Sequence, residues 1–89
     1  MLDSTVRIQN RLGLHARAAA LLVQTANKYA SEITIEKDGV EVNGKSIMGL
    51  MMLAAAKGTD VRIRTAGPDE QDALDGIMKL VADKFNEEA

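Results

Sequence analysis

The sequence predicts an α/β domain of the α+β type, an open-faced sandwich in which helices cover one side of a single sheet. Four short segments alternate apolar and polar residues, as strands with one solvated face do. Three other segments carry apolar residues at three- and four-residue spacing, as amphipathic helices do. The resulting order β-α-β-β-α-β-α favours an antiparallel or mixed sheet. Because the chain has only 89 residues, we expect residues 1–89 to form one domain.

The first strand and the first helix are separated by a short turn. Residues 5–9 alternate, with Val6 and Ile8 on one side, and predict a strand. The segment from Ala16 to about Lys28 predicts a helix, because apolar residues at positions 16, 19, 20, 23 and 26 would form one buried stripe. The turn between these elements contains His15.

The middle of the chain predicts a hairpin and then a short helix. Residues 33–36 and 40–42 alternate apolar and polar side chains, and Asp38-Gly39 between them is a two-residue turn signal. The second and third strands should therefore be neighbours. Ser46 follows as a predicted N-cap for a helix from Ile47 to about Leu53.

The last third predicts one more strand and the longest helix. Lys57-Gly58 is expected to stop the short helix, and residues 61–65 resume the alternation of a strand. Gly67-Pro68-Asp69-Glu70 predicts a helix start, since proline suits a first turn and acidic residues suit the positive end of the helix dipole. The tail Asn86-Glu87-Glu88-Ala89 is expected to fray in solvent. The apolar face of the last helix would consist of Ala73, Leu74, Ile77, Met78, Val81 and Phe85.

The composition argues against several classes of function. The formal net charge is −2 and the chain has only one tyrosine and one phenylalanine, so a nucleic-acid partner is not expected. Without cysteine there is no disulfide or thiolate chemistry, and a single histidine argues against a metal site. No stretch approaches the ~20 apolar residues that span a bilayer. We therefore expect a cytoplasmic protein without membrane insertion.

His15 is the best clue to function. It is the only histidine and lies where a turn ends and a helix is predicted to start. Unpaired N–H groups and the positive end of the helix dipole stabilise an anion at such a point, and Arg17 adds donors suited to phosphate. Gly13 permits a tight turn, and Ala16 and Ala18 leave the imidazole accessible. The residues alone leave two interpretations open, a surface or capping histidine and a phosphorylatable one.

The segment from Gly39 to Ser46 matches the phosphate-loop pattern G-x-x-x-x-G-K-[ST]. We reject a nucleotide triphosphatase, because Val40, Glu41 and Val42 alternate as a strand does, whereas a phosphate loop must curl so that its N–H groups converge. The chain is also too short for the parallel sheet of such enzymes.

The predicted short helix carries more apolar side chains than a small core can bury. Some of Ile47, Met48, Met51 and Met52 should be exposed, and adaptable side chains of this kind suit a docking surface, although methionine also fills gaps in cores. Ser46 likewise has two interpretations. Capping alone accounts for it, and a phosphoserine would also be tolerated at a helix start.

Three motifs resemble the HPr family, the histidine-containing phosphocarriers of the bacterial sugar phosphotransferase system. They are Gly13-Leu14-His15-Ala16-Arg17, Gly44-Lys45-Ser46-Ile47-Met48-Gly49 and Ala54-Ala55-Ala56-Lys57-Gly58. The resemblance implies a four-stranded antiparallel sheet with three helices packed on one face. It also implies that His15 accepts a phosphoryl group from phosphoenolpyruvate-charged enzyme I and passes it to enzyme IIA, with Arg17 contacting the phosphoryl group.

The same resemblance implies a regulated carrier that is not an enzyme and holds no cofactor. The residues leave the oligomeric state open, and we expect a monomer. Ser46 would be phosphorylated by HPr kinase/phosphorylase, next to a partner-docking surface made of Ala20, Ile47, Met48 and Met51. The alternative is a regulatory paralogue, such as the nitrogen-type branch, that acts mainly in signalling. One departure stands out, because the family usually has proline where this chain has Ala18, and we expect phosphoryl transfer to survive it.

Overall fold

A computed structural model describes residues 1–87 and contains one four-stranded antiparallel sheet. The strands are β1 (Leu2–Arg7), β2 (Glu32–Lys37), β3 (Val40–Asn43) and β4 (Asp60–Ala66), in the spatial order β1-β4-β2-β3. Every neighbouring pair is antiparallel. The predicted fold class is confirmed. The sequence pattern left an antiparallel or a mixed sheet open, and the sheet is antiparallel.

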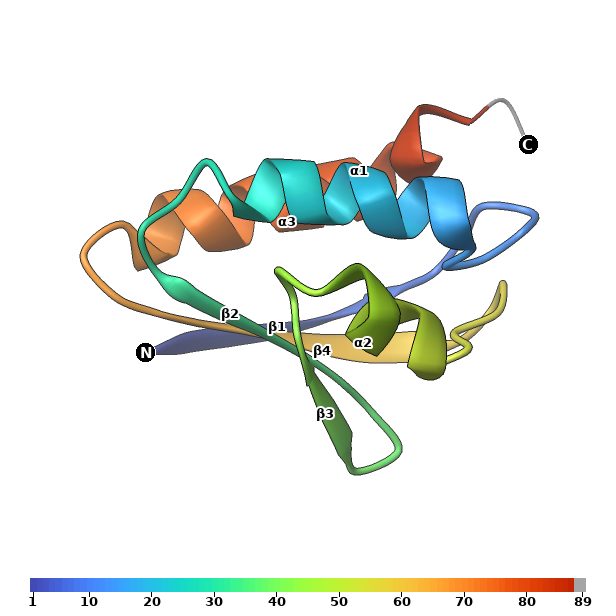
Figure 1. Ribbon diagram of the computed structural model, residues 1–89, viewed down its shortest axis with the longest axis horizontal. Helices are drawn as coiled ribbons and strands as arrows, with labels where there is room; N and C mark the ends of the chain where they lie inside the picture. Colours follow the sequence, from blue (N-terminus) through green and yellow to red (C-terminus); the bar gives the residue numbers. More distant parts are fainter. Residues whose placement is uncertain (88–89) are drawn as a thin grey trace.

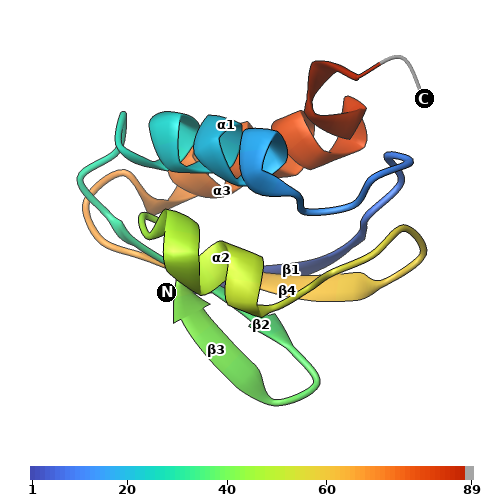
Figure 2. The same cartoon turned by 45° about the vertical axis from the view of Figure 1, so that its right-hand side comes forward.

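Three helices lie together on one side of the sheet (Figures 1 and 2). They are α1 (Ala16–Ala26), α2 (Ile47–Met52) and α3 (Glu70–Ala82), and a short 3₁₀ turn, η1 (Lys84–Asn86), follows α3. Helix α3 packs on β1 and β4, α2 packs on β3, and α1 lies against both α2 and α3. On β2 and β4 buried side chains alternate with more exposed ones, and on β1 partly buried side chains alternate with exposed ones, as in an open-faced sandwich.

The uncovered face of the sheet is polar and carries ion pairs. Arg64 Nη1 donates to Glu41 Oε1 at 2.8 Å across strands, and Arg7 Nε donates to Asp60 Oδ1 at 3.0 Å. These pairs are exposed, so each contributes little to stability. The charges keep this face wet and leave the apolar side chains to the opposite face, beneath the helices.

The hairpin turn behaves as its two residues predict. Asp38 and Gly39 have φ of 51° and 83°, both in the left-handed region that a two-residue turn of this kind requires. Lys37 pairs with Val40 directly across the turn. The predicted neighbourhood of the second and third strands is therefore confirmed.

The core beneath the helices is aliphatic apart from one ring. Phe85 is 1% exposed and is among the largest fully buried side chains. It was expected on the apolar face of the last helix, but it lies in η1, beyond the end of α3. The other large, fully buried apolar side chains are Ile8, Ile35, Leu50, Ile63, Ile77 and Val81.

Several predicted boundaries differ from the structure. Strand β1 runs over Leu2–Arg7 instead of residues 5–9, so buried Ile8 lies after the strand, where its N–H donates to Thr59 O at 2.8 Å. Helix α1 ends at Ala26, two residues short of the prediction. Pro68 precedes α3, which begins at Glu70.

The buried stripe of α1 is rotated from the predicted one. The structure buries Ala18, Ala19, Leu22 and Ala26 and leaves Ala16 exposed. The reason is that alanine dominates this helix. An alanine side chain tolerates both solvent and core, so the apolar pattern does not define which way the helix faces.

Helix α2 ends close to the predicted residue but for a different reason. Leu53 is its C-cap, and the next residue, Ala54, has a φ of 51°. Lys37 Nζ donates to the carbonyl oxygens of Leu53 and Ala54 at 3.1 and 3.4 Å. A left-handed alanine and a lysine from β2 thus end the helix, before the chain reaches Lys57-Gly58.

Candidate functional site

His15 occupies the N-cap position of α1. Its φ of −80° and ψ of 179° are extended, and its carbonyl oxygen accepts from the N–H of Ala19 at 2.8 Å, which starts the helix. Its side chain makes no capping hydrogen bond and is 27% exposed. The imidazole is therefore accessible at the end of the helix where the first backbone N–H groups have no partner within the helix.

The loop before His15 is fixed against the segment that follows α2. Gly13 has a φ of 65°, and the N–H of Leu14 donates to Ala55 O at 2.8 Å. A Cβ atom at position 13 would lie 2.5 Å from Ala55 O and 2.9 Å from the Cα of Ala56. Position 13 therefore requires glycine for two reasons, its positive φ and the close approach of two backbone segments.

Glu87, near the C-terminal end of the chain, contacts the side chain of His15. Its Oε1 contacts Nε2 of His15, and its Oε2 accepts from Nδ2 of Asn10 at 3.2 Å. The Glu87 side chain is only 17% exposed. The expectation of a fraying tail is therefore wrong for Glu87, whereas Glu88 and Ala89 lie outside the described residues.

The tail lies near His15 because η1, which follows α3, packs beside α1 (Figure 1). Lys84, Phe85 and Asn86 have φ of 56°, 54° and 62°, so three successive residues are left-handed. Such a turn costs roughly 1–2 kcal/mol per non-glycine residue, and burial of the Phe85 ring offsets this cost. The signal that could have revealed the turn is Phe85 itself, a large apolar residue after the last complete turn of α3.

The site is electrostatically asymmetric, with one carboxylate facing two basic residues. The hydrogen bond with His15 is the main cause that lowers the pKa of Glu87, and the hydrogen bond with Asn10 and the charge of Arg17 act in the same direction. Glu87 is therefore ionised at neutral pH. Arg17 is exposed on the first turn of α1, and its predicted contact with a phosphoryl group stays a prediction.

Asn10 connects Glu87 to the loop before His15, and the sequence analysis did not identify it as a site residue. It is completely buried, and its Nδ2 donates to Gly13 O at 2.7 Å as well as to Glu87. Among residues 1–87, its Oδ1 is the buried side-chain atom without a hydrogen-bond partner. Its neighbours in the sequence are polar, so neither periodicity nor spacing marked Asn10 as part of a site.

The apolar surface of α2 is exposed as predicted. Its four large apolar side chains are exposed as follows: Ile47 42%, Met48 76%, Met51 46% and Met52 78%. Ala20 is partly buried on α1, which contacts α2, so the predicted docking residues lie on two adjoining helices (Figure 2). Leu12, in the loop before His15, is also exposed, at 65%, and was missed.

Ser46 is the N-cap of α2, as predicted. Its Oγ accepts from the N–H of Gly49 at 3.1 Å, and the residue is partly exposed. This hydrogen bond satisfies one of the free N–H groups at the helix start. The capping interpretation is confirmed, and a second role as a phosphorylation site stays a prediction.

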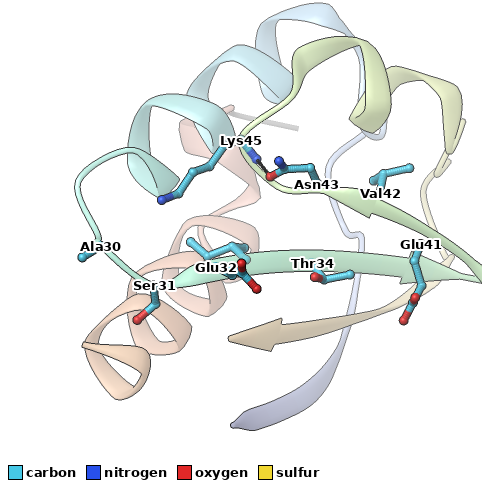
Figure 3. A pocket seen from close by; sticks show the side chains of 9 residues that line it. Ala30, Ser31, Glu32, Thr34, Glu41, Val42, Asn43 and Lys45 are labelled. Carbon is cyan, nitrogen blue, oxygen red and sulfur yellow. Dashed lines mark hydrogen bonds between the residues drawn. The ribbon is translucent and has the colours of Figure 1, made fainter. Parts of the chain in front are cut away.

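The phosphate-loop pattern does not form a phosphate loop. Val40 to Asn43 form β3, and Lys45 Nζ donates to the carbonyl oxygen of Tyr29 at 2.8 Å. Lys45 borders a groove of about 350 Å³ between β2, β3 and the loop that leads into β2 (Figure 3). This groove is lined by none of the predicted site residues.

Within residues 1–87, no group of three or more His, Asp or Glu side chains is placed to hold a metal ion. No helix in this range is long and apolar enough to cross a membrane.

Comparison with known proteins agrees with the motifs around His15 and Ser46. The family described as "PTS HPr component phosphorylation site" matches residues 2–83. Phosphocarrier protein HPr from Xylella fastidiosa is 49% identical over 88 residues, which cover 99% of this chain and 99% of that protein. The chain belongs to the HPr family. It is thus related over nearly its whole length to phosphocarriers of the phosphotransferase system.

Solved HPr structures have the same fold. HPr-C-His from Thermoanaerobacter tengcongensis superposes with a TM-score of 0.96 at 47% identity and covers 100% of both chains. Crh from Bacillus subtilis, described as a catabolite repression protein and a domain-swapped dimer, has a TM-score of 0.77 at 46% identity. That comparison covers 94% of this chain and 97% of Crh. The solved structures related to this chain therefore include one that forms a domain-swapped dimer.

Ala18 is the departure from the HPr pattern noted in the sequence. It is completely buried in the first turn of α1, three residues after the N-cap. In an α-helix the N–H of residue 18 would donate to the carbonyl of residue 14, which lies before the N-cap. The N–H of Ala18 is therefore one of the groups at the helix start that have no partner within the helix. Alanine here therefore adds one donor near His15 that proline would lack.

Proposed function

We propose that this chain is a phosphocarrier in which His15 accepts a phosphoryl group from phosphoenolpyruvate-charged enzyme I and passes it to enzyme IIA. The observation that carries the proposal is the position of an accessible imidazole at the N-terminus of α1, within the stretch that matches the HPr family. Backbone N–H groups there suit the phosphoryl oxygens, and Arg17 is available as a further donor.

The chemistry of imidazole suits a carrier. A neutral imidazole is nucleophilic near neutral pH, and a phosphorus–nitrogen bond is labile enough to release its phosphoryl group again. The chain would act as the substrate of one transferase and the donor to the next, with no reaction cycle of its own. We infer that residues 1–89 act as one domain and as a monomer, which light scattering of the purified protein would test.

The test is phosphorylation with enzyme I and phosphoenolpyruvate, followed by intact mass measurement. We expect a gain of one phosphoryl group that acid removes, because phosphohistidine is acid-labile and phosphoserine is stable. His15→Ala should show no gain. A gain that survives acid, or one that persists in His15→Ala, would place the reaction at another residue and reject the proposal.

The exposed face of α2 would receive these partner proteins. Ile47, Met48 and Met51 together with Ala20 form an apolar surface beside α1, and adaptable side chains of this kind suit several partners in turn. Ser46 lies at the start of the same helix. We infer that HPr kinase/phosphorylase modifies Ser46 and so places a negative charge within the docking surface.

We predict that Ser46→Asp is charged by enzyme I about tenfold or more slowly than wild type, because the new charge faces an apolar interface. Aspartate is as good an N-cap as serine, so α2 should persist. The matched control is Ser46→Asn, which also caps and is neutral, and it should be charged at nearly the wild-type rate. The measurement is the initial rate of acid-labile phosphorylation; equal rates for the aspartate and asparagine variants would contradict the prediction.

A second candidate function is a regulatory member of the family. It is favoured by the likeness to Crh, which is a catabolite repression protein of Bacillus subtilis. The two functions separate at the acceptor: a sugar-transport carrier would pass its phosphoryl group to an enzyme IIA of sugar uptake. A regulator would instead serve a signalling relay, such as the nitrogen-type branch.

A further inference from the structure

A basic hollow lies where three distant parts of the chain meet, the end of β1, the loop between α2 and β4, and η1 (Figures 1 and 2). Its volume is about 290 Å³. Of the residues that line it, only Ile8 is buried, so Ile8 lies at the base and the others form the rim. The lining consists of Arg7, Ile8, Gln9, Lys57, Gly58 and Lys84.

The charge of this basic hollow differs from that of the chain as a whole. Three of its six lining residues are basic and none is acidic, whereas the chain has 11 basic and 13 acidic residues. Among residues 1–87, no carboxylate forms an ion pair with Lys57 or Lys84. Two ammonium groups and one guanidinium therefore border a common space, and the repulsion between them falls when an anion occupies it.

Arg7 is held at the rim by Asp60 through one of its three side-chain nitrogens. Its Nε donates to Asp60 Oδ1 at 3.0 Å, and the same carboxylate raises the pKa of Arg7, so the guanidinium stays charged. Within residues 1–87 this is the hydrogen bond of the Arg7 side chain, so Nη1 and Nη2 remain as a planar pair of donors suited to phosphate. With Asp60 counted, two positive charges remain around the basic hollow, which matches a dianion.

The fold fixes the three segments that form the rim. The N–H of Ile8 donates to Thr59 O at 2.8 Å, and the N–H of Gly58 donates to Ile8 O at 2.7 Å. Lys84 begins the left-handed turn of η1 with a φ of 56°, and the ring of the next residue, Phe85, is 1% exposed. Because the backbone of the rim is already in place, an anion has to order only the ends of flexible side chains.

We propose that the basic hollow binds a small molecule that carries a phosphate monoester group, with Arg7, Lys57 and Lys84 donating to the phosphate oxygens. Such a group carries close to two negative charges at neutral pH and has three acceptor oxygens that point in different directions. A carboxylate offers two oxygens in one plane and fits three separated donors less well. The volume lies at the lower end of the range of small-molecule sites, about 300–1,000 Å³, so the rest of the ligand is small.

The proposal does not depend on the phosphoryl chemistry of His15. None of the six lining residues is among those assigned to phosphoryl transfer or to partner docking. The ligand would bind only when the end of β1, the loop before β4 and η1 are together. Binding should therefore stabilise the folded protein, and with it the position of η1.

The first test is a titration of the ¹⁵N-labelled protein with glycerol 3-phosphate at constant ionic strength. The backbone amide shifts of Gln9, Gly58 and Lys84 should change together and saturate, with a Kd of about 1 mM for so open a site. Arg17→Gln weakens any anion binding at the start of α1 and should leave these three shifts unchanged. Shifts that do not saturate, or that occur only at the start of α1, would overturn the proposal.

Charge-removing variants test which side chains bind the phosphate. Lys57→Gln and Lys84→Gln should each raise the Kd about three- to tenfold, since each removes one charge-assisted hydrogen bond at a solvated rim. Lys28→Gln removes the same charge from an exposed position after α1 and should bind like wild type. Unchanged binding by the double variant of Lys57 and Lys84 would overturn the proposal. Succinate, a dianion without phosphate, should bind more weakly, and an affinity equal to that of glycerol 3-phosphate would overturn the assignment of the ligand.

Thermal unfolding gives an independent measurement. At about ten times the wild-type Kd, glycerol 3-phosphate should raise the Tm of wild type by about 5 °C more than that of the double variant of Lys57 and Lys84. The variant is the necessary control, because phosphate compounds also stabilise proteins by being excluded from their surface. Equal increases in Tm for the two proteins would show that the stabilisation does not come from the basic hollow and would overturn the proposal.

Discussion

Replacing Gly13 with alanine is expected to lower the free energy of unfolding by about 2–5 kcal/mol and to slow charging of His15 severely. The new Cβ would lie 2.5 Å from Ala55 O and 2.9 Å from the Cα of Ala56, which are backbone atoms that cannot rotate away. The φ of 65° adds the strain of a left-handed alanine. Relief of the clash must move the loop that carries His15 away from the segment after α2.

Gly39→Ala provides the matched control. Gly39 also has a positive φ, 83°, but a Cβ there would meet nothing within 4 Å. It should therefore lose only about 1–2 kcal/mol and keep the wild-type rate of charging. Urea unfolding and the enzyme I assay on the three proteins separate the two effects. If Gly13→Ala were no less stable than Gly39→Ala, the close approach of the two backbones would not matter.

Regular elements of this fold were predictable because their signals are local. The turn at Asp38 and Gly39 needs two left-handed residues, which this pair adopts readily, and the cap at Ser46 needs one hydroxyl at the start of a helix. His15 belongs to the same class, since a histidine between a glycine turn and an alanine-rich helix is recognisable from its neighbours. In each case the atoms that matter lie within about four residues along the chain.

The rest of the site was not predictable because its partners are far apart in sequence. Glu87 is separated from His15 by 72 residues and from Asn10 by 77. An acidic residue near a terminus is ordinarily solvated. The left-handed turn that brings Glu87 to His15 contains no glycine, so the residue types do not indicate a turn there. Only the packing of Phe85 into the core explains the turn, and packing is a property of the whole fold.

Phe85→Ala is expected to cost about 3–5 kcal/mol of unfolding free energy, a large share of the stability of so small a domain. The ring is 1% exposed and is the aromatic side chain of the buried core. Its removal also releases the anchor of η1, so Glu87 should leave His15. The first measurement is urea unfolding, and a loss below ~1 kcal/mol would show that the ring does not anchor the tail.

The role of Phe85 in holding the tail can be tested separately from its role in global stability, by combining Phe85 variants with Glu87→Ala. Phe85→Leu keeps an apolar anchor at a smaller cost and serves where the alanine variant fails to fold. If Phe85 acts by placing Glu87, then Glu87→Ala should slow charging in wild type but should add little in a Phe85 variant that remains folded, because the contact is already lost. Independent, multiplicative effects on the rate would mean that the two residues do not act through one another. A non-additive result would show that core packing of the tail and the chemistry of His15 are one coupled system.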